Sequence, residues 1–318
     1  MGHKIQERKA QVKLVFLVLF LLVLNGCHNK PLYKDTQIMM GTFVEVVSPE
    51  KDASRVVFAE IKRVEDLLSK YKPNSEVSIL NRASELKVSP ETFYILKKSK
   101  EFYILSNGAF DITTAPLSDL WGFTHKKYIL PKRFRITDTL KLVGSDKIEL
   151  NDSVNVVKFK LSGMKIDLGG IAKGYALDCA VNKLKEAGIN SCLINIGGQV
   201  YCLGKRFGKP WRIVVRDDKN SKSSEILEIE DKSVATSGDY EQFFEVGKKR
   251  YSHIFNPKSG YPADLGVISA TIIAPSGLTA DALSTAVFVL GKDKGQLLVK
   301  KFPGVSARIT EKNINKRE

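Results

Sequence analysis

The alternation of hydrophobic and polar residues predicts several helices. Apolar residues recur at helical spacing over residues 57–68 while charged residues separate them, so one stripe of this segment should be buried. A second helix is predicted to begin near Pro90, a residue favoured at first helical positions, and to end at Gly108. The same pattern predicts helices over 175–187 and over 279–290, each followed by a glycine.

Short apolar runs between turn residues predict strands as well. Strands are expected at 35–47, with an interruption at Met39–Thr42, along the alternating residues from Val156 to Ile166, and at 192–196, 200–203 and 211–216. No repeat or low-complexity linker divides the chain. We therefore predict one domain over residues 35–312 with an α+β fold, in which mixed, largely antiparallel sheets are flanked by helices and two lobes enclose a cleft.

The first 26 residues have the pattern of a secretion signal: a basic start, an apolar run from Leu14 to Leu24, and a cysteine directly after the small residue Gly26. The apolar run is too short for a stable membrane span. The segment Leu24–Cys27 resembles a lipobox, which predicts that Cys27 is lipidated and that residues 27–34 form a short tether. The protein should then be anchored in a bacterial cell envelope, on the periplasmic face of the inner or outer membrane. The alternative is a soluble secreted protein with a chance cysteine.

The charge of the chain favours anionic partners. The full sequence carries a net charge of +15, and removal of residues 1–26 leaves about +12. Most lysines are scattered, although a basic segment extends to Arg135. We therefore expect phosphorylated small molecules or an anionic lipid surface as partners, and no nucleic acid. A solvated basic face without a partner is the other interpretation.

Three cysteines remain after Cys27, namely Cys179, Cys192 and Cys202. Their spacing matches no zinc site and each lies among apolar residues, so buried thiols are expected. A disulfide between Cys192 and Cys202 stays open.

The segment Asp167–Gly174, with the sequence DLGGIAKG, places two adjacent glycines between an apolar strand and a helix. Glycines allow a close approach of the backbone to an anion, and the free amides at a helix start attract negative charge. The segment is not a P-loop, because Tyr175 and Ala176 follow Gly174 where Lys and Ser or Thr would be required. The alternative is a strand-to-helix turn that needs glycine only for its shape.

The helix expected over 279–290 carries three oxygen-bearing side chains on one face: Asp281, Ser284 and Thr285. A carboxylate with hydroxyls three and four positions later offers hard ligands, which suit Mg²⁺ better than zinc. The alternative is an Asp that serves the helix dipole, with solvated hydroxyls.

Two histidines are candidates for acid–base chemistry, His125 and His253. His253 precedes the strong turn Asn256–Gly260 and is predicted to lie at the end of a strand, against a rigid bend. His125 leads into the basic segment and is the weaker candidate. A purely structural role of His253 is the alternative.

Eight segments in order carry a family resemblance: Met40–Thr42, Tyr71, Ala109–Asp111, Pro116–Phe123, Asp167–Gly174, Ala235–Tyr240, His253–Pro262 and Ala280–Thr285. Together they resemble the ApbE-type flavin transferases over roughly residues 35–309. Members of that family are often lipoproteins, in agreement with the expectation for Cys27.

The resemblance implies an FAD:protein FMN transferase with FAD as substrate and Mg²⁺ as cofactor. Such an enzyme attaches the FMN part of FAD through its phosphate to a Ser or Thr hydroxyl of an acceptor flavoprotein and releases AMP. The implied metal ligands are Asp281, Thr285 and the carbonyl of Ala172, with Ser284 nearby, and the implied catalytic residues are His253 and Asp281. The implied flavin contacts in the cleft are Met40, Tyr71, Ala109, Phe110, Asp111, Gly169, Tyr175 and Phe255.

Some positions depart from the family pattern. Gln199 stands where Asp is common, Asn256 and Ser259 replace Asp and Thr, and Lys173 occupies a variable position. Two other functions remain: an FAD pyrophosphatase that yields FMN and AMP, and a flavin-binding lipoprotein without catalysis. The presence of Asp281, Thr285 and His253 favours an enzyme.

Overall fold

The computed structural model describes residues 31–216, 224–247 and 249–312. Residues 33–318 group into one compact unit, separate from residues 1–32. Within the described part, none of the helices combines the length and apolar character needed to cross a membrane. The predicted signal at 1–26 and the lipidation site Cys27 lie outside the described residues.

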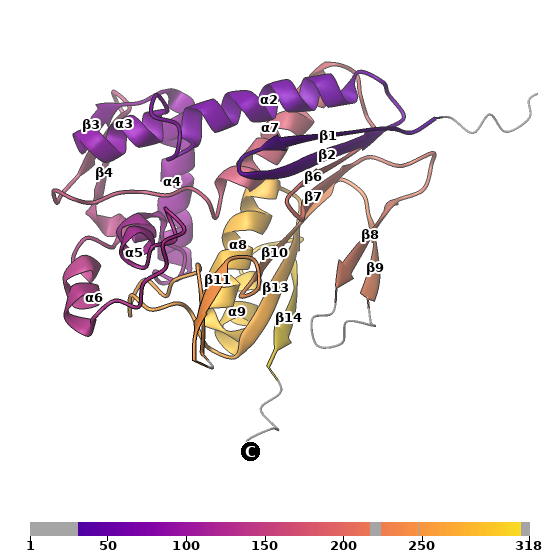
Figure 1. Ribbon diagram of the computed structural model, residues 1–318. Coiled ribbons are helices and arrows are strands. Elements are labelled where there is room, and N and C mark those ends of the chain that lie inside the picture. Colours follow the sequence, from indigo (N-terminus) through magenta and orange to yellow (C-terminus); the bar gives the residue numbers. More distant parts are fainter. Residues whose placement is uncertain (1–30, 217–223, 248, 313–318) are drawn as a thin grey trace, which may run out of the picture. The chain divides into compact units, whose positions relative to one another are not determined.

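A seven-stranded sheet forms the centre of this unit, and every neighbouring pair of strands in it is antiparallel (Figure 1). This confirms the predicted α+β class with antiparallel sheets. Met40 and Gly41 form the turn between the first two strands, at the predicted interruption. In spatial order the strands are β1 (Tyr33–Met39), β2 (Thr42–Ser48), β6 (Cys192–Ile196), β7 (Gln199–Leu203), β10 (Lys232–Gly238), β13 (Val267–Ala274) and β14 (Ser306–Glu311).

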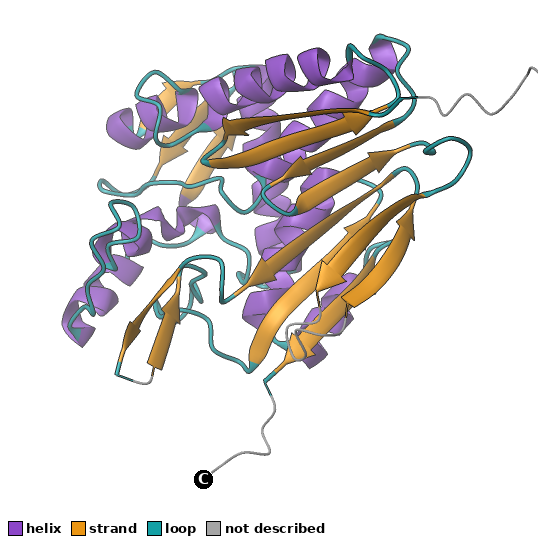
Figure 2. Ribbon diagram, turned by 45° about the vertical axis from the view of Figure 1, so that its right-hand side comes forward, coloured by secondary structure: helices purple, strands orange, loops and turns teal. Residues whose placement is uncertain are grey.

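Four helices cover one face of the sheet (Figure 2). They are α2 (Ala53–Leu68), α7 (Ala172–Glu186), α8 (Gly277–Leu290) and α9 (Lys292–Val299). In α2 the predicted stripe of Val57, Ile61, Val64 and Leu68 is buried. Helix α8 is enclosed almost completely, because it contacts β10 and β13 on one side and α7 and α9 on others.

The remaining elements form smaller units. A three-stranded sheet in the order β3 (Glu85–Lys87), β5 (Val156–Phe159), β4 (Ile148–Asn151) lies beside α3 (Glu76–Ala83), α4 (Pro90–Leu105), η1 (Ile112–Thr114), α5 (Ala115–Leu120), α6 (Arg133–Leu140) and η2 (Ser145–Lys147). Two hairpins complete the fold: β8 (Trp211–Arg216) with β9 (Ser224–Ile229), and β11 (Phe243–Val246) with β12 (Lys249–Ser252).

A second hydrophobic core lies apart from the main one and is rich in aromatic rings. Its buried members include Trp121, Phe123, Ile136 and Phe255, and Phe244, Tyr251 and Leu140 pack against them. We call this group the aromatic cluster. It joins α5 and α6 to the β11–β12 hairpin.

The long helices were predicted correctly, whereas the short ones were not. Helix α6 has eight residues and one buried side chain, Ile136, so its apolar period is too weak to detect. Residues Leu161 to Ile166, predicted as strand, form no strand in the structure. The cysteines at 179, 192 and 202 are all free, so the disulfide left open between Cys192 and Cys202 is not formed.

Candidate active site

Helices α7 and α8 meet at their first turns, backbone against backbone. A Cβ added at Gly174 would lie 2.1 Å from the carbonyl oxygen of Gly277, and a Cβ added at Gly277 would lie 2.4 Å from the carbonyl oxygen of Gly174. Any larger side chain at either position would force the helices apart. Glycine at both positions is therefore a packing requirement of the crossing.

Each of the two helices carries an aspartate that accepts hydrogen bonds from the start of the other. Asp281 of α8 accepts from the amide of Gly174 through Oδ2 at 2.9 Å. Asp178 of α7 accepts from the amides of Gly277 at 2.6 Å and Leu278 at 3.0 Å, one on each oxygen. Helix starts have unpaired amides, so both aspartates act as caps across the crossing.

The carboxyl groups of Asp178 and Asp281 differ in how many oxygens accept a backbone hydrogen bond. Both oxygens of Asp178 are occupied, and burial raises its pKa to about 6 against the opposing effect of the two amides. Asp281 uses one oxygen for Gly174, and its Oδ1 lies 3.9 Å from the ammonium of Lys173. Burial raises the pKa of Asp281 as well, while Lys173 and the amide bonds lower it.

Hydroxyl oxygens gather beside Asp281, as predicted for this face of α8. Ser284 donates to the carbonyl oxygen of Asp281 at 2.8 Å and shares a 2.8 Å hydrogen bond with Ser237 of β10. Thr285 Oγ1 lies 3.4 Å from the same Ser237 hydroxyl. No role was predicted for Ser237, because its position beside α8 depends on the pairing of distant segments.

The loop residue that lies against Thr285 is Gly170: a Cβ there would be 3.2 Å from Thr285 Oγ1. Ala172, whose carbonyl the sequence assigns to the metal, is the buried first residue of α7. The described residues contain no group of three His, Cys, Asp or Glu side chains that could hold a metal. A cation at this place would therefore rely on one carboxylate together with hydroxyl and carbonyl oxygens, a donor set that suits Mg²⁺.

Two lysines flank the glycine turn. Lys70 lies 2.8 Å from Asp167 Oδ2, and its side chain is only 8% exposed. Lys173 donates to the carbonyl oxygen of Gly169 at 3.1 Å. Burial disfavours the Lys70 ammonium, but Asp167 outweighs burial and raises the pKa of Lys70, so the group stays charged. Neither lysine was assigned from sequence.

Asp167 fixes the shape of this turn. Its Oδ1 accepts from the amide of Gly169 at 2.9 Å, and its backbone amide donates to the carbonyl oxygen of Ile112 at 2.7 Å. Gly169 is exposed and Gly170 half-buried. The predicted anion-binding segment is therefore a fixed and accessible loop, with the Lys173 ammonium on its backbone and the Lys70–Asp167 ion pair beneath it.

Of the predicted flavin contacts, Met40 and Tyr71 lie in accessible positions. Met40 forms part of the β1–β2 turn, and its amide donates to Glu65 Oε1 at 2.9 Å. The Tyr71 ring is 67% exposed and has the Lys70 ammonium 5.0 Å from its centroid. A ring this exposed can pack against a planar ligand.

Ala109, Phe110 and Asp111 are buried instead. The Phe110 ring packs edge-on against Phe102, with a centroid separation of 6.0 Å. Asp111 Oδ1 accepts hydrogen bonds from Thr113 and Ser145, whereas its Oδ2 is buried without a hydrogen-bond partner. Burial raises the pKa of Asp111. Among these three residues, Asp111 Oδ2 is the side-chain atom that can still accept a hydrogen bond from a ligand.

Tyr175 and Phe255 lie in other surroundings. The Tyr175 hydroxyl donates to Glu91 Oε1 at 2.9 Å, on the side of α7 that faces α4. There it helps to line a cavity of about 540 Å³ between α4, α7 and the start of α8. Phe255 is 6% exposed and belongs to the aromatic cluster. Their assignment to flavin binding stays a prediction.

His253 follows the last residue of β12, at the predicted strand end. Its Nδ1 lies 3.1 Å from the carbonyl oxygen of Gln242, and since a carbonyl can only accept, Nδ1 carries the proton and Nε2 has a free lone pair. Burial lowers the pKa of His253, the Gln242 carbonyl opposes this, and the Lys173 charge lowers it further. The ring is therefore neutral at pH 7.

The bend after His253 is held from two sides. The amide of Gly260 donates to the carbonyl oxygen of Asn256 at 2.9 Å, which closes the predicted turn. The Trp121 indole donates to the carbonyl oxygen of Gly260 at 3.1 Å, so the aromatic cluster supports it.

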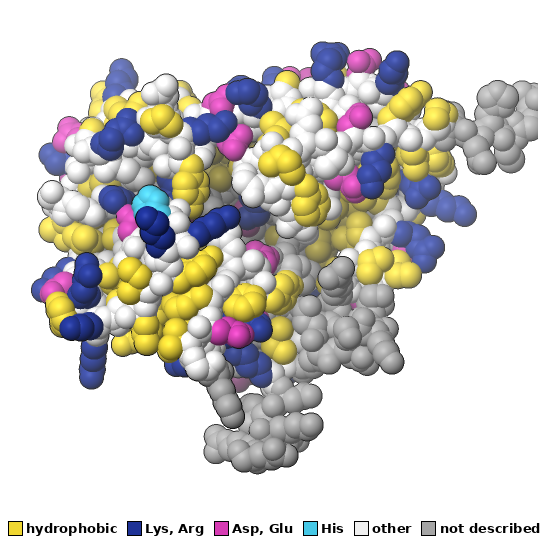
Figure 3. Space-filling model, in the orientation of Figure 1, with side chains coloured by type: hydrophobic (Ala, Val, Ile, Leu, Met, Phe, Trp, Pro, Cys, Tyr) yellow, Lys and Arg dark blue, Asp and Glu magenta, His cyan; other side chains and the backbone are white. Residues whose placement is uncertain are grey.

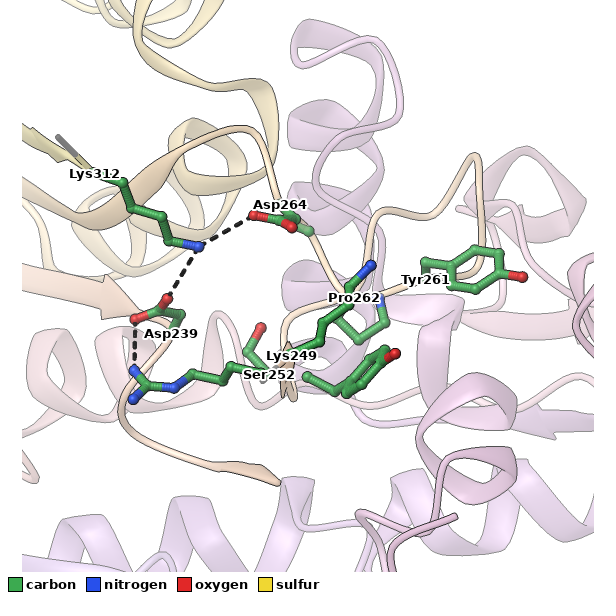
Figure 4. Close-up of a pocket in the computed structure, with 10 residues that line it drawn as sticks. Asp239, Lys249, Ser252, Tyr261, Pro262, Asp264 and Lys312 are labelled. Carbon is green, nitrogen blue, oxygen red and sulfur yellow. Dashed lines mark hydrogen bonds and ion pairs between the residues drawn. The ribbon is translucent and has the colours of Figure 1, made fainter. Parts of the chain in front are cut away.

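Ion pairs hold the hairpin that precedes His253. Asp239, directly after β10, lies 3.5 Å from Arg250 and 3.6 Å from Lys312, and Lys312 lies 3.1 Å from Asp264 (Figure 4). These groups line a cavity of about 30 Å³, and Ser252 Oγ, which also lines it, is buried without a hydrogen-bond partner. The motif residue Asp239 thus connects β10 to the strand that carries His253.

Comparisons with known proteins identify relatives of the chain. The profile of the ApbE family matches residues 40–309. The FAD:protein FMN transferase of Treponema pallidum is 31% identical over 86% of this chain and 83% of its own length, and that of Haemophilus influenzae is 33% identical over 74% and 72%.

Solved structures show the same fold. The ApbE protein from Thermotoga maritima superimposes with a TM-score of 0.80 at 35% identity, covering 89% of this chain and 97% of its own. The flavin transferase ApbE from Vibrio cholerae gives a TM-score of 0.81 at 28% identity, over 90% and 96%. The chain therefore belongs to the ApbE family and is an enzyme of the transferase class.

Proposed function

We propose that the chain moves the FMN part of FAD to a Ser or Thr hydroxyl of an acceptor flavoprotein, in a reaction that depends on Mg²⁺ and releases AMP. One observation carries the proposal: Lys173 connects the parts of the site. It contacts the Gly169 carbonyl, lies near Asp281, and acts on the pKa of His253. Lys173 thus joins the anion loop to the metal-type oxygens, and its charge acts on the neutral imidazole.

The glycine turn supports binding of a pyrophosphate. Lys173 places a positive charge beside Gly169, and the first turn of the 15-residue helix α7 adds the positive end of its dipole. The buried Lys70 pairs with Asp167 and so holds the carboxylate that shapes the turn. The exposed Tyr71 ring and the Met40 turn would pack against the flavin, and Asp111 Oδ2 would accept a hydrogen bond from a ring N–H.

The donor set fits Mg²⁺, so we assign the cation to Asp281, Thr285 and a carbonyl at the start of α7. The family resemblance implies the carbonyl of Ala172, the first residue of α7. Ser284 is less suited, because its hydroxyl is engaged with Ser237 and the Asp281 carbonyl. When bound, Mg²⁺ would neutralise charge that develops on the dividing pyrophosphate.

His253 would accept the proton of the acceptor hydroxyl on Nε2. The hydroxyl oxygen forms a bond to the phosphorus of the FMN half, the bond from that phosphorus to the bridging oxygen breaks, and AMP leaves with the bridging oxygen. The low pKa of His253 keeps Nε2 free to take that proton at neutral pH.

We also propose lipid anchoring through Cys27 on the outer side of the cytoplasmic membrane or on the outer membrane. The order of basic start, apolar run, small residue and cysteine supports it. Wild-type protein should sediment with membranes, and Cys27→Ser should not. Equal distribution of both forms would contradict the anchor.

The central test incubates the protein with FAD, Mg²⁺ and an acceptor fragment that carries an exposed Thr, and weighs all products. An acceptor heavier by one FMN phosphoester, together with free AMP, supports transfer. Free FMN with unmodified acceptor would indicate a pyrophosphatase, and unchanged FAD that stays bound would indicate a carrier.

A further inference from the structure

Residues 126–135 expose apolar side chains in an unusual density. Tyr128, Ile129, Leu130 and Phe134 are 42%, 58%, 47% and 62% exposed. Figure 3 shows apolar side chains gathered over the lower left of this face, with Lys and Arg around them. Clustered exposed apolar residues rimmed by polar groups are typical of interaction surfaces. We call residues 126–135 the basic–apolar segment.

The segment is held in place although its side chains are exposed. The amides of Lys127 and Ile129 donate to the carbonyl oxygens of Gly122 at 2.9 Å and Trp121 at 3.1 Å. A Cβ added at Gly122 would lie 1.8 Å from the Lys127 carbonyl oxygen, so the segment lies directly on the backbone of residue 122. Tyr128 stacks on Phe244 at 5.2 Å and anchors the segment to the aromatic cluster. A fixed surface loses little entropy when a partner binds.

Five cations of the segment have no acidic partner among the described residues; they are Lys126, Lys127, Lys132, Arg133 and Arg135. The nearest carboxylates in the chain are already used, since Asp119 pairs with Lys165 and Asp138 with Lys141. Across the hairpin, Glu245 lies near Arg250. The segment therefore presents uncompensated positive charge together with apolar side chains.

The basic–apolar segment is continuous with the candidate active site. The His253 ring lies 6.5 Å from the Phe123 ring, and Phe123 lies 5.3 Å from Tyr128 in an edge-on contact. Two ring contacts thus lead from the proposed proton acceptor to the segment.

We infer that the basic–apolar segment docks the acceptor protein through an acidic stretch with apolar residues beside its Ser or Thr. This rests on the proposed function and names the partner class of that reaction. Unpaired cations favour an acidic partner, the apolar side chains favour one with apolar residues, and the ring contacts to His253 place it where a hydroxyl is needed.

The place of the segment in the fold favours a protein over a membrane as its occupant. Helix α6, which contains Arg133 to Arg135, and the start of β1 lie on opposite sides of the described unit in both views (Figures 1 and 2). Under the proposed lipidation of Cys27, the anchored end of the chain leads into β1 and not into the segment.

The test compares two matched changes of charge. Lys132→Glu with Arg133→Glu reverses two cations at the start of α6, and Lys51→Glu with Lys294→Glu reverses two exposed, unpaired lysines near the starts of α2 and α9. Anionic residues suit helix starts, so both double variants should fold. The probes are two peptides of about 20 residues around one Thr, one rich in Asp and the other with Asn at those positions, measured by calorimetry at low and high salt.

The Asp peptide should bind the wild type about tenfold more tightly than the Asn peptide, and the α6 reversal should remove that difference. The control reversal should change affinity less than about twofold, and Phe134→Ser should weaken binding at both salt concentrations. Equal binding of the two peptides, or equal loss in both double variants, would overturn the inference.

Three further measurements separate the causes of a negative result. Loss of binding to vesicles of phosphatidylglycerol in the α6 variant, with peptide binding intact, would make the segment a membrane surface and overturn the inference. A wild-type dimer in light scattering that Phe134→Ser converts to monomer would assign it to a second copy instead. FMN transfer by the wild type with an unchanged KM for the acceptor in the α6 variant would refute docking here while the proposed function stands.

Discussion

Asp178 and Asp281 are the same side chain in nearly the same arrangement, yet the structure gives them different roles. Each lies on one of two crossing helices and caps the other helix. Asp178 accepts from backbone amides with both oxygens, whereas Asp281 accepts with one and has the other 3.9 Å from the Lys173 ammonium. An aspartate that caps a helix with one oxygen keeps the other oxygen for a ligand. One that uses both oxygens for the cap contributes only to the fold.

The largest effect should come from Asp281→Asn. The amide oxygen can still accept from Gly174, so the variant should fold with nearly unchanged thermal stability. Loss of the charge that would hold Mg²⁺ should lower the rate of FMN transfer by about a hundredfold or more. Transfer rates over a Mg²⁺ titration measure the loss of activity, and melting temperatures measure the stability of the variant. A large loss of stability with normal turnover would reverse the roles assigned to the two aspartates.

The next largest effect should come from Gly174→Ala, because it disturbs the hydrogen bonds of both Asp178 and Asp281. The new Cβ would lie 2.1 Å from the Gly277 carbonyl oxygen, so the helices must separate, at a cost of about 3 kcal/mol in the free energy of unfolding. Urea unfolding measures it. Gly188→Ala is a control in which the new Cβ meets nothing within 4 Å and the cost comes from the positive φ alone. A loss no greater than that of the control would show that the crossing is not tight.

Asp178→Asn should reduce stability and leave the chemistry intact. The variant keeps one acceptor but turns an amide NH₂ toward a backbone N–H, which costs roughly 1–2 kcal/mol. Turnover of the folded fraction should stay within about twofold of wild type. Thermal unfolding and transfer assays at a temperature well below the transition separate the two. A selective loss of turnover would mean that Asp178 also acts on the site.

The smallest effect concerns pH. The pKa of Asp178 is about 6 in the folded protein, above that of an unfolded aspartate, so the folded state binds more protons between roughly pH 4 and 6. Stability from this group therefore rises as pH falls through 6. Wild type should gain about 1 kcal/mol over Asp178→Asn between pH 7 and pH 5. Melting curves of both proteins at each pH test the sign; a constant gap would refute the raised pKa.

The parts of the site that depend on local pattern could be predicted from sequence. Asp281, Ser284 and Thr285 share one helical face by periodicity alone, and the Asn256–Gly260 turn fixed the expected place of His253. The helices of 14 to 16 residues were predicted for the same reason. Local spacing determines these features before any tertiary contact forms.

Features that depend on distant pairing could not be predicted. Asp178 and Gly277 are 99 positions apart, and Lys70 meets Asp167 only after α2 and the glycine turn are packed. Phe110 and Asp111 were expected to face a ligand because their motif is known, yet direction depends on packing, and the Phe110 ring lies in the core. Position in a motif does not give the direction of a side chain.

The reciprocal caps have a dynamic consequence. The amides of Gly174, Gly277 and Leu278 each end on a carboxylate of the opposite helix, so they can exchange with solvent only when the two helices come apart. Their hydrogen exchange should follow one shared opening, slow and cooperative. The amides of the exposed Gly169 turn should exchange faster, because they do not require the two helices to separate. A ligand that orders the turn alone and one that strengthens the whole crossing would therefore leave different exchange patterns.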